Sequence, residues 1–407
     1  MAPQEGSSTR GGGGPVTDVA DERGRVGDVS APGRMWLLIR EVLRDLRGYE
    51  SPPETNTDHL DAAIQWLYAS QDATDVGGCA SVYNLVLGWG GPYPETTGYI
   101  VPTLYDYAAL TGDATPRHRA ERMATWLLST QLDDGGFPAG VDPTPETEPS
   151  VFNTGQILLG LVRAYEETGE ERYREAVRRA GDWLVSVQHA DGYWDRFDYN
   201  DTVHSYSARV APALIRAAEV TDEPSFRDAG AANLRWAAGQ ARGNGWFEHC
   251  GFEPGADPFL HTIAYTVRGL LDGGIALDDE EILDAARRSA DALHDIKRRD
   301  GALRGQYDAE MRPRQFYCLT GNAQMAVVWY RLYGETAEER YREVADETVA
   351  FLKSQQRMDG PPAVRGGLRG SDPVWGRYMS LRYPNWAAKF LADALLLAER
   401  YDGSPGT

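Results

Sequence analysis

Apolar and polar positions along this chain form a block that repeats roughly every 56 residues. In each block an amphipathic helical segment ends at a glycine turn, a variable loop follows, and a more apolar helical segment completes the unit. The turn glycines are Gly78, Gly135, Gly192, Gly245, Gly301 and Gly360, separated by 57, 57, 53, 56 and 59 residues. A large apolar residue precedes each turn at the matching place: Trp66, Trp126, Trp183, Trp236, Leu293 and Phe351. This pattern predicts six consecutive helical hairpins.

The two helices of each hairpin differ in how apolar they are, which indicates how the hairpins assemble. A helix that is apolar all round belongs inside a protein, and an amphipathic helix belongs at its surface. An open solenoid needs polar caps at its ends, but the last helical segment, YPNWAAKFLADALLL, is as apolar as the earlier inner ones. We therefore predict an all-α, closed (α/α)6 toroid over residues 54–403. A helix and linker over residues 34–53 and a disordered, glycine-rich tail over residues 1–33 are expected to precede it.

Composition and charge limit which classes of partner the protein can bind and where in the cell we expect it. The formal net charge is −20, and only three of the 41 basic residues are lysines. Nucleic-acid binders need a basic face, so this class is excluded. An acidic, lysine-poor surface is typical of proteins adapted to salt, although an arginine-rich codon usage gives the same pattern. Three scattered cysteines form no disulfide framework, and no signal peptide or membrane span is visible, so we expect a cytoplasmic protein that binds no membrane.

Two of the turns carry a motif that extends this picture. The segments QLDDGGF from Gln131 to Phe137 and QHADGYW from Gln188 to Trp194 share the pattern Q-x-x-D-G-x-[WF]. This pattern resembles the turns of α/α-toroid proteins, which include six-hairpin glycosidases, sugar epimerases, lanthionine cyclases, terpenoid cyclases and prenyltransferase β-subunits. The resemblance covers nearly the whole chain and implies the scaffold, whereas the chemistry has to come from the site.

The loops that lead into the inner helices carry the candidate chemistry. In such toroids these helix N-termini surround one opening, where their N–H groups and positive dipole ends meet. Glu95 precedes one inner helix, and His204 and His261 are the only histidines at an inner-helix start. A helix N-terminus lowers the pKa of a histidine and favours its neutral form. We predict acid–base catalysis by Glu95, His204 and His261, supported by Tyr265 and Arg209, in loose resemblance to the paired histidines of toroidal sugar 2-epimerases.

Further polar and aromatic residues at the same six places predict the substrate class. Aromatic faces stack on the C–H faces of sugar rings, while amides and hydroxyls bond to sugar hydroxyls. The residues expected to contact the sugar are Tyr99, Asn153, Gln156, Trp194, Tyr206, Trp246, Asn322, Gln324, Trp375, Tyr383 and Asn385. Any one of them could equally serve as a helix cap or a satisfied buried polar group. We expect a glycoside hydrolase, sugar epimerase or lyase that acts on a sugar or oligosaccharide in a central funnel.

Three alternatives stay open at this point. Cys250, His261 and Cys318 could bind zinc as lanthionine cyclases do, but their order in the chain differs from that family, so no cofactor is the first expectation. A terpenoid cyclase or prenyltransferase-like toroid is a second alternative, although the Asp-rich acid motif D-x-D-D of the class II cyclases is absent. A toroid that binds a ligand without catalysis is the third. The sequence does not predict the oligomeric state.

Overall fold

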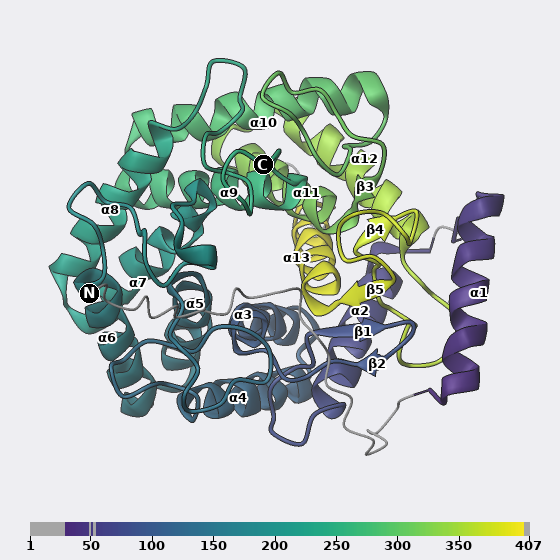
Figure 1. Cartoon of the computed structure of the whole chain (residues 1–407), viewed down its shortest axis with the longest axis horizontal. Coiled ribbons are helices and arrows are strands. Elements are labelled where there is room, and N and C mark those ends of the chain that lie inside the picture. Colours follow the sequence, from purple (N-terminus) through teal and green to yellow (C-terminus); the bar gives the residue numbers. More distant parts are fainter. Residues whose placement is uncertain (1–28, 49, 52–53, 403–407) are drawn as a thin grey trace, which may run out of the picture.

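The computed structural model describes residues 29–48, 50–51 and 54–402. Its helices form two concentric rings (Figure 1). The outer ring comprises α2 (Asn56–Asp72), α4 (Ala114–Leu128), α6 (Glu171–Ser186), α8 (Pro224–Ala238), α10 (Glu280–Asp300) and α12 (Glu339–Gln355). The inner ring comprises α3 (Pro94–Thr111), α5 (Val151–Thr168), α7 (Ala211–Thr221), α9 (Leu260–Leu277), α11 (Leu319–Thr336) and α13 (Asn385–Asp402). The predicted (α/α)6 toroid is confirmed.

The ring is closed because the last inner helix returns to the first repeat. Helix α13 packs against both α2 and α3, while each other inner helix packs on its neighbours. At the same place strand β5 (Arg382–Pro384) pairs antiparallel with β1 (Val82–Asn84), which also pairs with β2 (Gly88–Trp89). Strands β3 (Tyr317–Cys318) and β4 (Ser371–Asp372) form a second small antiparallel pair. Backbone hydrogen bonds therefore join the two ends of the described chain and seal the toroid.

The spacing of glutamine and glycine that recurs in two of the turns has a structural cause. The Gln131 amide nitrogen donates to the Gly135 carbonyl of its own turn and to the Ala176 carbonyl of the next outer helix, both at 2.9 Å. Gln188 repeats the arrangement one unit later, with Gly192 at 2.9 Å and Ala229 at 3.0 Å. Each glutamine thus fixes a turn and links two repeats. Its function in the Q-x-x-D-G motif is to hold the scaffold.

The N-terminal region differs slightly from its predicted boundaries. Helix α1 covers Ala31–Arg47, so it begins three residues before the predicted start and includes residues assigned to the tail. The rest of the predicted disordered tail, residues 1–28, lies outside the described residues. Figure 1 shows α1 at the edge of the toroid, outside both rings. No helix within the described ranges is both long and apolar enough to cross a bilayer.

Candidate active site

Helix α9 shows how side chains are layered down the centre of the toroid. His261, Tyr265, Arg268 and Asp272 recur at intervals of four, three and four residues, so they lie on one face of the helix. His261 stands in the first turn, and its ring lies 4.4 Å from that of Tyr265. Arg268 and Asp272 form an ion pair two turns further down. We call the end of the ring that carries the inner-helix N-termini the mouth and the deeper charged layer the floor.

Glu95 is a buried carboxyl group at the mouth. It stands in the first turn of α3, only 8% exposed. Removal from water penalises the ionised form, so burial raises the pKa of Glu95 to about 7, although a hydrogen bond from the Tyr93 hydroxyl lowers it in part. A carboxyl with this pKa carries a proton in about half of the molecules at neutral pH. Glu95 can therefore act as a proton donor under ordinary conditions.

Five tyrosines lie within electrostatic range of Glu95, four of them buried and Tyr93 partly buried. Burial raises the pKa of each phenol, and the Glu95 charge raises it further. They come from the loop before α3, from α3, from the short helix η2 (Ser205–Arg209), from α9 and from the loop before α13. They are Tyr93, Tyr99, Tyr206, Tyr265 and Tyr378. These elements lie at different places around the toroid, so a carboxylate that acts on all five tyrosines faces its centre. We call these five residues the tyrosine cup.

His261 lies beside two members of the tyrosine cup. Its ring is 4.4 Å from that of Tyr265 and 5.1 Å from that of Tyr378. Burial lowers the pKa of His261 to about 3, so the imidazole is neutral at physiological pH, as its position predicted. The Gln324 amide nitrogen lies 2.7 Å from Nδ1. With the amide as donor, Nδ1 accepts and the ring proton is on Nε2, which makes His261 a hydrogen-bond donor.

His204 belongs to a neighbouring cluster. Its Nε2 lies 2.8 Å from the Tyr199 carbonyl oxygen and 2.9 Å from the Thr202 hydroxyl, and its ring stacks on Tyr206 at 4.5 Å. The negative charge of Asp198 lies close by, and burial raises the pKa of that carboxyl group. We predicted that Glu95, His204 and His261 lie around one point. Among the described residues, His204 contacts the tyrosine cup only by stacking on Tyr206, so its place beside the other two stays a prediction.

Arg209 lies at the floor. Its guanidinium is 3.5 Å from Asp272, which also pairs with Arg268 at 2.5 Å and Arg331 at 2.6 Å. Burial alone would raise the pKa of Asp272, but the three guanidinium groups outweigh it and lower the pKa to about 2. This ion-pair layer gives Arg209 a role in holding the inner helices. If Arg209 affects catalysis as predicted, it would do so through Tyr265. The positive charge of Arg209 lowers the pKa of that phenol slightly.

Three predicted sugar ligands support the mouth loops. The side-chain amide of Asn153 donates to the Pro138 carbonyl, and that of Asn322 donates to the Leu303 carbonyl, both in the preceding loop and both at 2.9 Å. The amide of Asn385 donates at 2.9 Å to the Ala80 carbonyl in the first repeat. All three asparagines are buried, at most 4% exposed. Their amide nitrogens therefore support the loops. The side-chain oxygens of Asn322 and Asn385 have no hydrogen-bond partner within the described residues, so the assignment of these residues to substrate binding stays a prediction.

Asn322→Ala is expected to destabilise the protein by about 1–3 kcal/mol because it leaves the Leu303 and Cys318 carbonyls without their donor. Chemical denaturation of the variant and the wild type would measure the difference. A change below a few tenths of a kcal/mol would show that water replaces the amide and that the loop needs no support from it.

The remaining predicted ligands divide between the interior and the mouth. Trp194 is 1% exposed and donates its indole N–H to the Leu184 carbonyl at 3.0 Å, so we correct it to a packing residue. Tyr383 is fully buried and its pKa responds to charges from α1 and the adjoining loop, which places it on the outer side. Gln156 is fully buried, and neither of its amide atoms has a partner within the part of the chain that is described. Trp375 is 45% exposed in the loop before α13.

A cavity of about 150 Å³ opens beside His204 and Trp246. It is lined by the loops before η2 and α9 and contains Trp246, His249, Glu253 and Asp257. Its volume is similar to that of one sugar ring. The cavity joins an indole face to carboxylates and an imidazole, which is the residue combination predicted for a sugar subsite.

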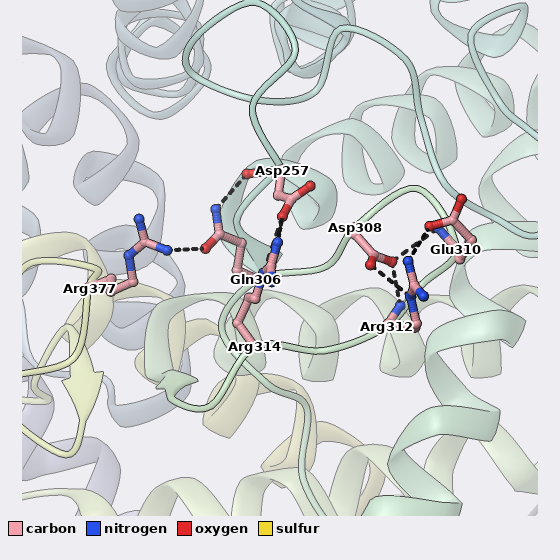
Figure 2. A network of polar contacts seen from close by, with 7 residues as sticks. All are labelled: Asp257, Gln306, Asp308, Glu310, Arg312, Arg314 and Arg377. Atoms are coloured by element: carbon pink, nitrogen blue, oxygen red, sulfur yellow. Dashed lines mark hydrogen bonds and ion pairs between the residues drawn. The ribbon is translucent and has the colours of Figure 1, made fainter.

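Polar contacts connect three of the mouth loops. Figure 2 shows Arg377 donating to Gln306, whose amide donates to the Asp257 carbonyl at 2.7 Å. Arg314 pairs with the Asp257 carboxylate. The loops before α9, α11 and α13 are thereby held together on one side of the mouth, which fixes the wall of the cavity.

The cysteines do not assemble a metal site. Cys318 caps α11, accepting a hydrogen bond from the Gly321 N–H at 3.4 Å, and Cys250 lies 3.5 Å from the Thr266 hydroxyl. Among the residues that the structure describes, no group of three or more His, Cys, Asp or Glu side chains is arranged to hold a metal ion. The zinc alternative through Cys250, His261 and Cys318 is therefore wrong for this arrangement.

Two tyrosines of the cup, Tyr93 and Tyr378, are not among the residues predicted to contact the sugar. Tyr93 is the extended residue directly before α3 and Glu95 stands in the first turn of that helix, where the Tyr93 hydroxyl donates to the Glu95 carboxylate. Tyr378 also receives a hydrogen bond from the Trp386 indole at 2.9 Å. It comes from a long loop, where sequence alone gives no direction for a side chain.

Comparisons with known proteins agree with this fold. The family model for pectic acid lyase matches residues 152–220, which extend from α5 to α7. An uncharacterized protein of Bradyrhizobium diazoefficiens is 33% identical over 94 residues, and one of Sinorhizobium fredii is 34% identical over 88 residues. These matches cover 23% and 22% of this chain but only 17% and 16% of the relatives.

Solved structures resemble the chain over most of its length. A crystal structure of an unsaturated glucuronyl hydrolase specific for heparin has a TM-score of 0.68 at 15% identity and covers 86% of this chain and 98% of its own. A sugar epimerase from a ruminal bacterium has a TM-score of 0.65 at 13% identity, with 91% and 100% covered. A polysaccharide lyase has a TM-score of 0.63 at 12% identity, with 87% and 100% covered. At these identities the likeness establishes the toroid fold.

Proposed function

We propose that this chain is a carbohydrate-active enzyme, a glycoside hydrolase, epimerase or lyase, that uses Glu95 as its proton donor in the central funnel. The observation that carries the proposal is the buried Glu95 carboxyl, whose pKa is raised to about 7 inside the tyrosine cup. Protonation of a glycosidic, leaving-group or ring oxygen is common to these three reaction types. A donor with a pKa near the working pH combines a high protonated fraction with a useful acidity.

Neutral His261 would hold the reacting sugar beside Glu95. Its Nε2 proton can donate to a sugar hydroxyl or to an oxygen that gains negative charge, while Gln324 fixes the tautomer. The aromatic faces of the tyrosine cup would pack on the sugar ring, and their hydroxyl groups would bond to its hydroxyls. Buried polar atoms of Gln156 and Tyr206 have no hydrogen-bond partner in the described ranges, so a polar ligand would satisfy them.

The names of similar proteins support the same substrate class. Those with solved structures are described as a glucuronyl hydrolase, a sugar epimerase and a polysaccharide lyase, and the matching family model is pectic acid lyase. All four descriptions concern carbohydrates. A terpenoid-type toroid is disfavoured because an apolar substrate would leave the buried Gln156 amide and Tyr206 hydroxyl without a partner and would place the Glu95 carboxyl group against hydrocarbon.

Trp246→Ala is expected to raise KM about tenfold and to leave kcat within about threefold. Trp246 lines the cavity of about 150 Å³, whose lining does not include Glu95, so we place it in an accessory subsite that binds sugar without entering the reaction. Steady-state kinetics on an oligosaccharide would measure both constants. An equal loss in kcat would contradict the accessory role.

A substrate panel in heavy water would identify the reaction. Neutral and uronic-acid oligosaccharides are incubated with the wild type and with Glu95→Gln, and the products are separated by mass spectrometry. New reducing ends alone indicate hydrolysis, a new carbon–carbon double bond indicates elimination, and carbon-bound deuterium indicates epimerisation. If no oligosaccharide is converted while several bind, the chain is a binding toroid and the proposed activity is wrong.

A further inference from the structure

Helix α1 packs Leu37 into the core but also exposes a second stripe of apolar side chains, while its two acidic side chains are buried. Trp36, Ile39, Leu43 and Leu46 are 58%, 51%, 40% and 69% exposed. In contrast, Glu41 is fully buried. A helix normally turns its apolar stripe to the protein and its charges to water. The stripe on α1 is therefore available to bind something that is not part of the described chain.

Ion pairs hold α1 in this orientation. Glu41 lies 3.3 Å from the buried guanidinium of Arg357, and Asp45 pairs with Arg369, with both of these side chains 4% exposed. Asp45 also accepts a hydrogen bond of 2.6 Å from the Val374 N–H. Breaking a buried pair costs several kcal/mol, so rotating the stripe toward the toroid would be unfavourable. The outward direction of the apolar stripe is fixed by the fold.

The stripe has the spacing of a helix–helix interface. Intervals of three, four and three residues are those of heptad positions a, d, a and d. These intervals are the same from the N-terminus to the C-terminus of the stripe and in the reverse direction. An antiparallel copy of α1 would therefore set Trp36 against Leu46 and Ile39 against Leu43, and a twofold axis near residue 41 would relate the two helices.

The exposed area is sufficient for such a contact. Met35 on the same helix is 56% exposed, and Val86 and Leu87 in the adjoining hairpin are 48% and 49% exposed. Arg34 links this hairpin to α1 by donating to the Val86 carbonyl at 3.0 Å. With the four stripe residues they expose an area on the order of 700 Å², close to the roughly 800 Å² that each partner contributes to a standard interface.

We propose that the exposed face of α1 is the dimerisation surface of this protein, with antiparallel α1 helices of two copies packed across a twofold axis. Charge is compatible with this arrangement because Arg40, beside the stripe near the axis, is already paired with Asp359 of its own chain. In the dimer the Arg40–Asp359 ion pairs of the two copies would lie near each other, and each pair carries no net charge. Residues 1–28 of the same chain contain no Leu, Ile, Phe, Trp or Tyr, so they are poorly suited to cover the stripe.

The oligomeric state of the full chain tests the proposal. Light scattering after size exclusion, with a dilution series by sedimentation, is expected to give twice the chain mass of 44.9 kDa for the wild type. The double variant Ile39→Glu with Leu43→Glu is expected to weaken the dimer at least about 30-fold. Leu110→Glu is the matched control, since Leu110 is a 51% exposed apolar residue at the end of α3, and it should remain dimeric.

Oxidative cross-linking tests the direction of the helices. The double variant Ile39→Cys with Leu43→Cys should form a linked dimer, and either single variant should not, because the antiparallel register sets each position against the other. A wild type that stays monomeric at 100 μM (about a hundredfold above a micromolar Kd) overturns the proposal. So does a dimer that survives the double glutamate variant, or a monomer that floats with phosphatidylcholine vesicles.

Discussion

Glu95→Gln is expected to lower kcat by about 10²–10⁴-fold at neutral pH, with KM changed by less than about threefold. Glutamine keeps the size of the side chain and can still accept the hydrogen bond from the Tyr93 hydroxyl, but its amide has no acidic proton to transfer. Steady-state kinetics on the substrate found in the oligosaccharide panel would measure both constants. In the wild type, activity should fall as the pH rises through about 7, because the donor then loses its proton.

A matched control separates the role of Glu95 from that of a general loss of negative charge. Glu146 is an exposed carboxylate in the loop before α5, and Glu146→Gln should leave kcat unchanged. If both variants lost activity equally, the effect would come from the field of the acidic chain. If Glu95→Gln kept more than a tenth of the wild-type kcat, Glu95 would not be the proton donor.

The same substitution has a stability signature that needs no substrate. The pKa of Glu95 is raised from 4.5 to about 7 in the folded protein, so the folded state binds a proton that the unfolded state has lost in this range. The contribution of Glu95 to wild-type stability therefore falls as the pH rises from about 4.5 to about 7, by about 3 kcal/mol in total. Glu95→Gln removes this loss, and its stability relative to the wild type should be about 3 kcal/mol greater at pH 8 than at pH 4. Denaturation at the two pH values measures it.

His261→Ala is expected to lower kcat by at least about 10²-fold, while the free energy of unfolding changes by no more than about 2 kcal/mol. The variant removes the neutral ring that lies between Tyr265, Tyr378 and Gln324. Kinetics and chemical denaturation of the same preparation would give both values. Unfolding of the variant would show that the ring is a structural element of the core.

Two amide replacements distinguish the nitrogens of His261. The side-chain amide of Gln can place an N–H near the position of Nε2, and that of Asn near the position of Nδ1. If the Nε2 proton is the one used, His261→Gln should keep at least tenfold more activity than His261→Asn. The reverse order would mean that the Nδ1 side, next to Gln324, carries the function.

The fold was predictable because every repeat carries the same local signals. Turn glycines at nearly constant spacing, an aromatic or aliphatic residue before each turn, and a paired polar and apolar helix are all properties of short windows of sequence. Closure of the ring also followed from a local property, the apolar character of α13, which packs on α2 and α3. In contrast, the orientation of α1 depends on ion pairs with Arg357 and Arg369, more than 300 positions away in the chain, and no helical pattern encodes it.

For the site, the sequence predicted which positions along the chain lie near the mouth, but it did not predict in which direction each side chain points. Asn322 and Gln324 stand two residues apart at the start of α11, yet one holds a loop carbonyl and the other contacts His261. Two residues on a helix differ by about 200° in direction, so one faces the loops while the other faces the ring centre. Glu95 and His261 were singled out because a charged or titratable residue at an inner-helix start is unusual. Tyr93 and Tyr378 were not assigned to the substrate because tyrosine in a loop is common and its side-chain direction cannot be read from the sequence.

The carboxyl titration of Glu95 tests the central claim most directly. Carbon-13 NMR of protein labelled at the glutamate side-chain carboxyl, compared with Glu95→Gln to assign the signal, follows one group as the pH is changed. The account predicts a signal with a midpoint near 7 that is absent from the variant. A midpoint near 4.5 would contradict it, because Glu95 would then be ionised at neutral pH and would have no proton to give to a sugar oxygen.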